Sequence, residues 1–442
     1  MKIPRFSLRK KIILSFLLVI LFGGVITLIL GSRLIRETLI SQAQDKVKHD
    51  LSSAWMVFNE KISDIKELVS LTSTRKTLQE SIKSKNYVSL SKYLNHLRKD
   101  FGLDILNVAD SQGKIIIRTQ NPGETGDDQS NDIIIKKALA KDVSASSQLI
   151  PREELLKEGK DLANRAVIDI KPTPKATESS KTRETRGMIL KAASPILDEQ
   201  NNLLGVLYGA VLINKDYEIV DRVKEMVYKG EKYKGHEIGT ATIFLHDLRI
   251  STNVKNKDGS RAIGTRVSQK VNQAVLEKGK SYIDRAFVVN DWYITAYEPI
   301  RNLDNQIIGI LYVGMLEKPY IDTAHRVMMT FIFMASLCVV LLLVLLYFTT
   351  NRIINPLRKI VEATQKIAKG DLSHKVKVHS KDEIGYLAES FNKMTDDLDA
   401  ANKKLIDWGK TLEKKVEERT KELKEMQAHL IQSEKLASLG KL

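Results

Sequence analysis

The chain has 442 residues, a hydrophobic fraction of 43% and a formal net charge of +16. These values allow about two to four folded domains and exclude a disordered chain. The basic residues are spread along the whole sequence and no helix gathers them on one face, which argues against nucleic-acid binding. Because Cys338 is the single cysteine, a disulfide framework and a cysteine-based metal site are excluded.

Two uncharged segments predict helices that cross a membrane. Residues 12–30 and residues 328–348 contain no charged side chain, and each is long enough to span the hydrocarbon core. Basic residues such as Lys2 precede the first span, and others such as Arg352 follow the second. By the positive-inside rule we expect residues 1–11 and the chain after the second span to be cytoplasmic, and residues 32–326 to lie outside.

The external region alternates helical and strand-like periodicity. Apolar spacing and turn residues predict these elements. The predicted helices cover residues 34–71, 76–98 and 131–140, the predicted strands cover residues 103–109, 115–119, 188–195 and 203–213, and residues 171–186 are predicted to form an exposed loop.

An internal repeat divides this region into two modules. Residues 194–212 align without a gap on residues 298–316, which pairs Gly205 with Gly309 and Tyr208 with Tyr312. The hairpin that begins at Ile105 has a counterpart that begins at Ala241. We therefore expect a first module at about 32–215 and a second at 216–326.

The order of long helix, hairpin, central helix and terminal meander, duplicated between two membrane spans, resembles the double Cache sensory domain. The closest likeness lies in TATIFLHDLRISTNV, DGSRAIGTRV and DWYITAYEPIRNLDNQIIGILYVG of the second module. The resemblance implies an α+β domain with PAS-like sheets that binds a small ligand in the periplasm. Such a sheet holds its ligand where polar side chains converge on an apolar concave face.

Six residues are candidates for binding that ligand, which we expect to be a small organic anion because cations and hydroxyls bind carboxylates by charge-assisted hydrogen bonds. The alternative for each is a surface cation or a packed tyrosine. The aspartates of the second module lack calcium-loop spacing, so no metal is expected. The candidates are Arg249, Thr252, Tyr293 and Tyr297 in the second module and Arg118 and Lys191 in the first.

Two amphipathic helices joined by an extended connector follow the second span. Pro356 suits the first turn of the first helix, and Gly370 suits its left-handed stop. Ser380 and Glu383 have the spacing of a capping box before the second helix, and Gly385 follows. INPLRKI, AKGDLSHKV and DEIGYLAESFNKM resemble the HAMP domain, here at 351–403. The resemblance implies a homodimeric, all-α four-helix bundle with Pro356, Gly370, Glu383 and Gly385 as relay residues.

Residues 404–432 follow a heptad pattern that predicts a signalling coiled coil. Residues 433–442 resemble the start of the dimerisation and phosphoacceptor helix of sensor histidine kinases. None of the eight histidines is followed by an acidic residue and Asn-Pro, and no glycine-rich ATP loop is present. We therefore expect no catalytic residue and no cofactor in this chain, with ATP, magnesium and a response regulator implied only for a kinase domain that it lacks.

These patterns predict a multidomain membrane protein with two transmembrane helices, a double Cache sensor, a HAMP bundle and a coiled coil. The resemblances imply the sensing part of a two-component histidine kinase in the inner membrane of a bacterium, truncated before its phosphoacceptor histidine. The alternatives are a methyl-accepting chemotaxis receptor and a sensor with a cyclase output. The reading frame beyond Leu442 would distinguish the three.

Overall fold

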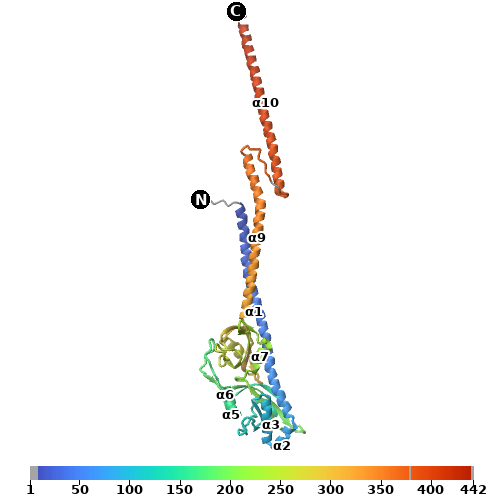
Figure 1. The fold of residues 1–442 in the computed structure, drawn as a ribbon, viewed down its shortest axis with the longest axis vertical. Coiled ribbons are helices and arrows are strands. Elements are labelled where there is room, and N and C mark those ends of the chain that lie inside the picture. Colours follow the sequence, from blue (N-terminus) through green and yellow to red (C-terminus); the bar gives the residue numbers. More distant parts are fainter. Residues whose placement is uncertain (1–7, 378–379, 440–442) are drawn as a thin grey trace. The chain divides into compact units, whose positions relative to one another are not determined.

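The computed structural model describes residues 8–377 and 380–439, so Lys2 and Arg5 of the charge argument and the last three residues of the predicted 433–442 segment lie outside the described residues. The chain forms two compact units, one from Ser32 to Met328 and one from the remaining residues at both ends. Figure 1 shows the ribbon coloured along the sequence. The first unit holds two five-stranded sheets.

The first sheet is antiparallel, with helices on both faces. Its strand order is β2-β1-β7-β6-β3. The strands are β1 (Ile105–Asp110), β2 (Ile115–Ile117), β3 (Ser144–Ile150), β6 (Gly187–Leu197) and β7 (Leu203–Leu212). One face packs against α1 (Leu8–Ser73), α2 (Lys76–Lys83) and α3 (Tyr87–Asp100). The other packs against α4 (Ile133–Leu139), α5 (Arg152–Glu158) and α6 (Lys160–Ala166).

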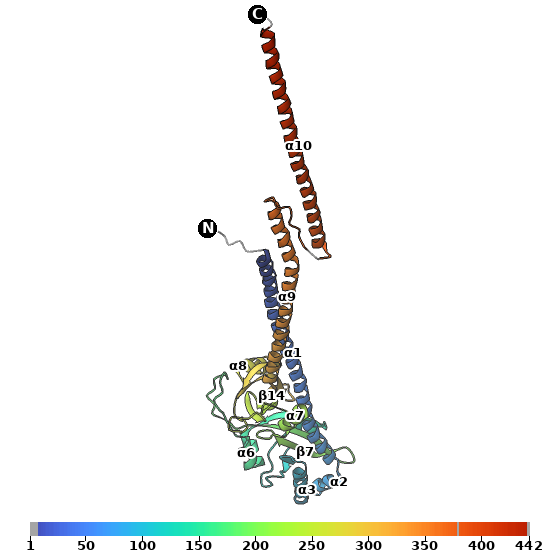
Figure 2. The ribbon, with the colours of Figure 1, turned by 45° about the horizontal axis from the view of Figure 1, so that its top comes forward.

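The second sheet repeats this arrangement with the order β11-β10-β14-β13-β12. The strands are β10 (Gly239–Leu245), β11 (Leu248–Thr252), β12 (Tyr282–Val288), β13 (Asp291–Arg301) and β14 (Ile307–Leu316). One face joins the core of α1 and of α7 (Glu218–Tyr228), and Figure 2 shows α1 passing both sheets. The other face packs against α8 (Gln269–Val271) and the π-helix η1 (Asn272–Glu277). Two short ribbons complete the unit: β4 (Ile168–Asp169) with β5 (Arg183–Glu184), and β8 (Lys232–Tyr233) with β9 (His236–Glu237).

The repeat is present in the structure, but its first hairpin is displaced by one residue from the alignment. Asn107 lies opposite Tyr208, whereas Thr242 lies opposite Tyr312. The alignment that starts at Ile105 and Ala241 instead matches Asn107 with Ile243. Because β1 and β10 are buried along almost their whole length, they lack the polar alternation that sets a register.

Two further expectations are corrected. The helix predicted at 76–98 is broken into α2 and α3, because Lys85 has a φ of 56° and Asn86 caps α3 through a hydrogen bond from the Ser89 amide. The loop predicted at 171–186 is largely exposed, but Arg183 and Glu184 form β5. Side-chain caps and positive φ values are set by single residues, which helical periodicity does not detect.

The paired glycines of the repeat mark a close approach between strands. A Cβ at Gly309 would lie 2.1 Å from the carbonyl oxygen of Phe244, and backbone in the middle of a sheet cannot move aside. We expect Gly309→Ala to lower the free energy of unfolding by about 3 kcal/mol, since overpacking forces strands apart. Urea unfolding of residues 32–328 measures this.

Gly123→Ala is the control for Gly309→Ala, because no atom lies within 4 Å of its added Cβ. It should change the free energy of unfolding by less than about 0.5 kcal/mol. Equal midpoints for the two variants would contradict the close approach.

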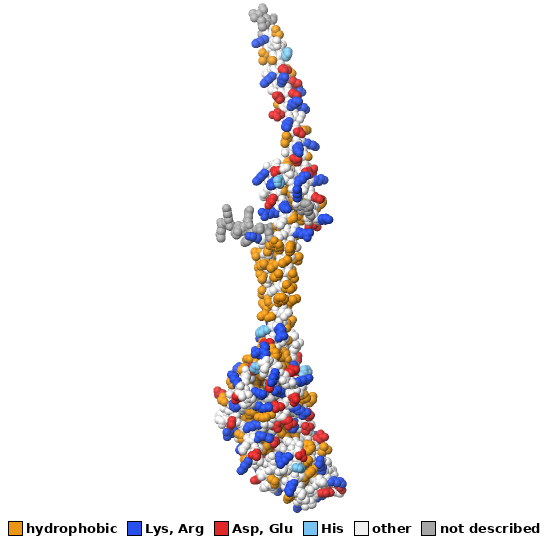
Figure 3. Space-filling view, viewed as in Figure 1, with side chains coloured by type: hydrophobic (Ala, Val, Ile, Leu, Met, Phe, Trp, Pro, Cys, Tyr) orange, Lys and Arg blue, Asp and Glu red, His pale blue; other side chains and the backbone are white. Residues whose placement is uncertain are grey.

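The second unit contains the two candidate membrane spans and the segment predicted to be HAMP. α1 and α9 (Lys318–Ile367) each include a stretch long and apolar enough to cross a membrane, and Figure 3 shows a band of hydrophobic side chains there. α10 (Glu383–Leu439) follows a connector. Ile360, Ala363, Val376 and Ala388 form a small core with Phe391 against it, so the connector packs between the two helices.

Candidate functional site

A cavity of about 170 Å³ lies against the first sheet, on the face covered by α4 and α5. Ile105, Ile189 and Ala210 form part of its apolar wall. A cavity of this size holds a small organic molecule, since about 150 Å³ is enough for benzene. The polar residues that line it are Gln129, Asp132, Gln148, Glu154, Glu158, Lys191 and Tyr208.

Lys191 and Asp132, both in the lining of the cavity, form an ion pair. Lys191 Nζ lies 2.7 Å from Asp132 Oδ2 and 4.7 Å from the centre of the Tyr208 ring. The other oxygen of Asp132 accepts the amides of Ile134 and Ile135 and so caps α4. Burial opposes ionisation of Asp132, but Lys191 and Gln148 outweigh it, so the pKa of this carboxyl lies below its ordinary value. The Asp132 carboxylate is therefore held by Lys191 on one oxygen and by the start of α4 on the other.

Arg118 lies behind the cavity and binds Glu158, one of the residues that line it. It does not line the cavity, but its guanidinium donates to both oxygens of Asp127, at 2.9 and 3.1 Å, and to Glu158 Oε1 at 2.9 Å. Burial opposes ionisation of Asp127, and the hydrogen bond from Arg118 overcomes it and lowers the pKa of that carboxyl to about 2. Arg118 is thus occupied by two carboxylates of the chain, which leaves it little capacity for a ligand.

The second module buries a different arginine. Arg249 is 6% exposed, and its Nη1 donates to Thr265 Oγ1 at 2.7 Å. Its Nε has no hydrogen-bond partner. The guanidinium carbon lies 5.2 Å from the centre of the Phe244 ring. None of the ion pairs within residues 8–377 and 380–439 includes Arg249.

Tyrosines surround Arg249 in an aromatic cluster. The rings of Tyr297 and Tyr312 lie 4.8 Å apart, and both are buried. Burial raises the pKa of Tyr293 to about 12, with Asp291 adding to the effect. Thr252 lies opposite Thr242, which in turn lies opposite Tyr312, so its side chain is on the same face of the sheet, and its hydroxyl is 2.6 Å from that of Thr242. The structure therefore groups Arg249 with Tyr293 and Tyr297 in one core and uses Thr252 to join two strands.

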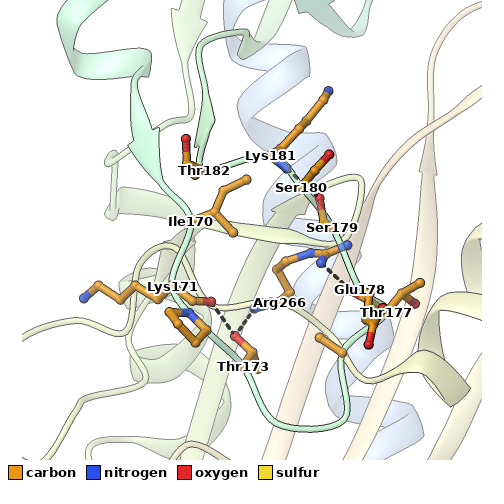
Figure 4. Close-up of a pocket in the computed structure, with 12 residues that line it drawn as sticks. Ile170, Lys171, Thr173, Thr177, Glu178, Ser179, Ser180, Lys181, Thr182 and Arg266 are labelled. Carbon is orange, nitrogen blue, oxygen red and sulfur yellow. Dashed lines mark hydrogen bonds between the residues drawn. The ribbon is translucent and has the colours of Figure 1, made fainter.

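A wider hollow of about 750 Å³ is formed by residues 170–182, here called the strap, together with Arg266 (Figure 4). Thr173 Oγ1 accepts the amide of Arg266 at 3.0 Å, and Arg266 Nη1 donates to the carbonyl of Thr177 at 2.6 Å. The amide of Gln269 donates to the carbonyl of Lys175. The strap, expected to be only an exposed loop, thus ties the first module to the second.

In the predicted relay segment, the structure corrects the position of Pro356. It lies inside α9, which continues from the membrane span without a new start, and not in the first turn of a helix. A proline at this point removes one backbone hydrogen bond and weakens the helix locally. Gly370 has a φ of 94°, as a left-handed stop requires.

The start of α10 is capped by Asp382 and not by Ser380. Asp382 Oδ1 accepts hydrogen bonds from the amides of Ile384 and Gly385 at 3.0 and 3.2 Å. Its negative charge also interacts favourably with the positive end of the helix dipole. Glu383 is the first residue of the helix. A Cβ at Gly385 would lie 1.9 Å from the carbonyl oxygen of Ser380, so this position requires glycine for a steric reason that helix propensity alone does not indicate.

Sequence reasoning missed several residues of the cavity. Asp132 and Gln148 precede the α5 residues Glu154 and Glu158 on separate elements, and none of the four belongs to a sequence motif. Tyr208 was aligned with Tyr312 in the repeat, and this alignment could have identified both, since each lies on the same face of its sheet.

Two family models match the chain. Residues 211–327 match Single cache domain 3, and residues 348–400 match the HAMP domain. The first match covers the second module, and the first module has the same strand order. The chain therefore carries a Cache sensor domain between two candidate membrane helices, followed by a HAMP domain.

Curated relatives include both chemoreceptors and a sensor protein. A probable methyl-accepting chemotaxis protein of Bacillus thuringiensis is 36% identical over 96 residues, which cover 22% of this chain and 15% of the relative. Sensor protein SrrB of Staphylococcus aureus is 26% identical over 163 residues, covering 33% of this chain and 28% of the relative. The chain thus matches between 15% and 28% of the length of these relatives.

Solved sensor domains are also similar. The periplasmic domain of LuxQ from Vibrio cholerae has a TM-score of 0.36 and 9% identity, covering 61% of this chain and 99% of that domain. The ligand-binding domain of chemoreceptor Tlp3 from Campylobacter jejuni, in complex with 4-methylisoleucine, has a TM-score of 0.34 and 10% identity, covering 65% of this chain and 94% of that domain.

Proposed function

We propose that this Cache and HAMP chain is the sensing and transmission part of a sensor histidine kinase in a bacterial inner membrane. A small ligand binds the periplasmic unit, and the HAMP segment transmits the change to a kinase that phosphorylates a response regulator. The observation that carries the sensing role is the cavity of the first module, where charged side chains converge on an apolar wall.

The charges around this cavity favour a ligand that carries an amine. The carboxylates outnumber the cations by one, so an ammonium group would balance the cluster, and each carboxylate can accept a charge-assisted hydrogen bond. The expected anion fits this cavity less well. The cations are Arg118, Lys157 and Lys191, and the carboxylates are Asp127, Asp132, Glu154 and Glu158.

Two features support a kinase output. The match to the sensor protein SrrB covers 33% of this chain, and residues 433–442 resemble the start of a phosphoacceptor helix. A chemotaxis receptor remains the second candidate, because the chemotaxis relatives share up to 36% identity. The two differ in the output that follows α10.

The proposed assembly is a parallel homodimer. Leu405, Leu412 and Leu423 on α10 are 64–69% exposed in the single chain, although their spacing is that of a heptad seam. A second copy of α10 would bury this seam.

The test of the ligand site uses Glu154, which lines the cavity. A panel of small primary amines, applied to the full chain in nanodiscs, should include one that raises the melting temperature. Glu154→Gln should lower the affinity of the chain for that amine by about tenfold, since a hydrogen bond to a charged group contributes roughly 1.5–3 kcal/mol.

Glu153→Gln is the control for Glu154→Gln, because Glu153 lies next to it on α5 but is exposed and outside the cavity. It should bind the amine like the parent. Equal affinity of the two variants, or a panel in which carboxylates alone stabilise the chain, would exclude the proposed site.

A further inference from the structure

The strap, residues 170–182, is a loop whose two ends meet and whose middle is hollow. The Ile170 amide donates to the carbonyl of Thr182 at 2.9 Å, and β4 pairs with β5 directly outside these residues. The hollow of about 750 Å³ lies inside the loop, and most of the side chains that line it are hydroxyl-bearing or charged (Figure 4). Compact loops of this kind are usually packed by their own side chains. Since a hollow takes the place of such packing, contacts from outside determine the position of the strap.

The second module holds the strap through one short segment, residues 264–272. Every second strap residue from Lys171 to Thr177 bonds to this segment, as along an extended strand. The donor–acceptor distances lie between 2.6 and 3.4 Å. The bonded pairs are Lys171 with Gly264, Thr173 with Arg266, Lys175 with Gln269, and Thr177 with both Arg266 and Asn272. The strap is therefore fixed to the second module over this stretch.

This segment leads into the cover of the second sheet. Val267, Val271 and Val275 belong to the buried core between the sheet and η1, and η1 contacts β13 and β14. β14 ends at Leu316, and α9, which carries the second candidate span, begins at Lys318. π-Helices are rare and frequently mark functional sites. The strap thus fixes the start of a cover that lies on the strand preceding the second span.

Both ends of the strap come from elements that line the first-module cavity. α5 carries Glu154, and α6 connects α5 to β4 and the strap. β5 leads into β6, which carries Lys191 of the cavity lining. A Cβ at Gly264 would lie 2.2 Å from the carbonyl oxygen of Asp169 in β4, so this end of the strap also contacts the second module. A shift of α5 or β6 therefore reaches residues 264–272 through few intervening residues.

We propose that the strap transmits occupancy of the first-module cavity to the cover of the second sheet, and through it to β14. This inference rests on the sensing role proposed for that cavity. The alternative route is the core that α1 shares with both sheets. That core lies on the opposite face of each sheet, whereas the cavity and η1 lie on the faces that the strap joins. The strap is therefore the direct connection between the two.

The test perturbs the cavity and measures the cover. Lys191→Met breaks the ion pair with Asp132 in the full chain, held in nanodiscs. Amide hydrogen exchange in residues 267–277 is measured by mass spectrometry relative to residues 87–100 of α3, so that a change in global stability cancels. We expect Lys191→Met to speed this exchange about fivefold, the lower end of the usual coupling between distant sites.

Shortening the strap should remove this effect. Residues 172–180 are replaced by Gly-Gly, which closes β4 and β5 into a short hairpin because their ends already meet. The replacement deletes the contacts of Thr173, Lys175 and Thr177 with the second module. Lys191→Met in this background should change the exchange by less than about twofold, since the comparison of single and double variants measures the coupling itself.

Thr173→Val provides a second test that keeps the strap at its full length. It removes the hydroxyl that accepts the Arg266 amide and should reduce the effect of Lys191→Met. The matched control is Thr182→Val, because Thr182 lines the same hollow and its hydroxyl bonds to no described residue of the second module. This control should keep the effect.

A full effect of Lys191→Met with the shortened strap would place the coupling in the α1 core and overturn the proposal. No effect with the parent strap, or equal effects in Thr173→Val and Thr182→Val, would also overturn it. Because a substitution perturbs the cavity, these outcomes do not depend on the amine panel. If no amine stabilises the chain but the effect requires the strap, the proposed ligand is wrong and the coupling stands.

Discussion

Arg118→Met should lower the free energy of unfolding of the periplasmic unit by about 3–5 kcal/mol, the range for breaking a buried ion pair by removing one partner. In the variant, the Glu158 side chain, which is 6% exposed, loses the cation that pairs with it. Asp127 also loses its bidentate partner. Asn107 continues to donate to Glu158, at 2.8 Å, but a neutral amide cannot balance the charge. Urea unfolding of residues 32–328 at neutral pH measures the loss.

The effect of Arg118→Met should also depend on pH. In the folded parent, burial opposes ionisation of Asp127, but Arg118, with smaller contributions from Gln129 and Lys157, lowers the pKa of this carboxyl from 3.8 to about 2. A carboxyl with a lowered folded pKa contributes stability above its unfolded pKa and loses it as the pH falls through the folded value. The difference in free energy of unfolding between the parent and Arg118→Met should therefore have its full size above about pH 5. It should become smaller between about pH 4 and pH 2.

The control for Arg118→Met is Arg183→Met, whose ion pair with Asp169 is exposed on both sides, at 60% and 72%. Exposed pairs contribute about 0–1 kcal/mol. If Arg118→Met unfolds at the same urea concentration as this control, Arg118 does not stabilise the unit through its ion pairs with Asp127 and Glu158.

The second large effect is expected at the start of α10. Gly385→Ala should abolish ligand control in a chimera that joins this chain to an intact histidine kinase domain. The added Cβ would lie 1.9 Å from the carbonyl oxygen of Ser380, so the connector or the helix start must move. In the parent chimera we expect ligand binding and kinase output to be coupled by about 1–3 kcal/mol, or roughly a 5–150-fold change in activity. In Gly385→Ala the activity with ligand should be about equal to the activity without it.

Gly409→Ala is the matched control, because Gly409 lies in the same helix and no atom lies within 4 Å of its added Cβ. It should respond to ligand like the parent chimera. Kinase activity is measured with and without ligand, and ligand affinity of the periplasmic unit is measured in parallel and should be unchanged in both variants. A Gly385→Ala chimera that still responds fully would show that the HAMP segment acts as a passive spacer.

Although the edge strands β3 and β12 were not predicted, local patterns in the sequence were sufficient for the two candidate spans, the HAMP domain, the repeat and the strands β1, β2, β6 and β7 of the first sheet. Each of these depends on hydrophobic periodicity or on turn residues within a short window. The left-handed stop at Gly370 is local in the same sense. Periodicity did not reveal that Pro356 lies inside a continuous helix, because the helix is maintained by the turns on both sides of the proline.

Only the tertiary structure decided what each buried cation does. Arg118 follows β2 and Arg249 lies within β11, yet Arg118 meets Glu158 from 40 residues away and Arg249 meets no carboxylate in the described chain. The cavity likewise combines Asp132 with Lys191, 59 residues later. Sequence patterns report the neighbours along the chain, whereas the charge of a buried site is set by residues that the sheet topology brings together from distant positions.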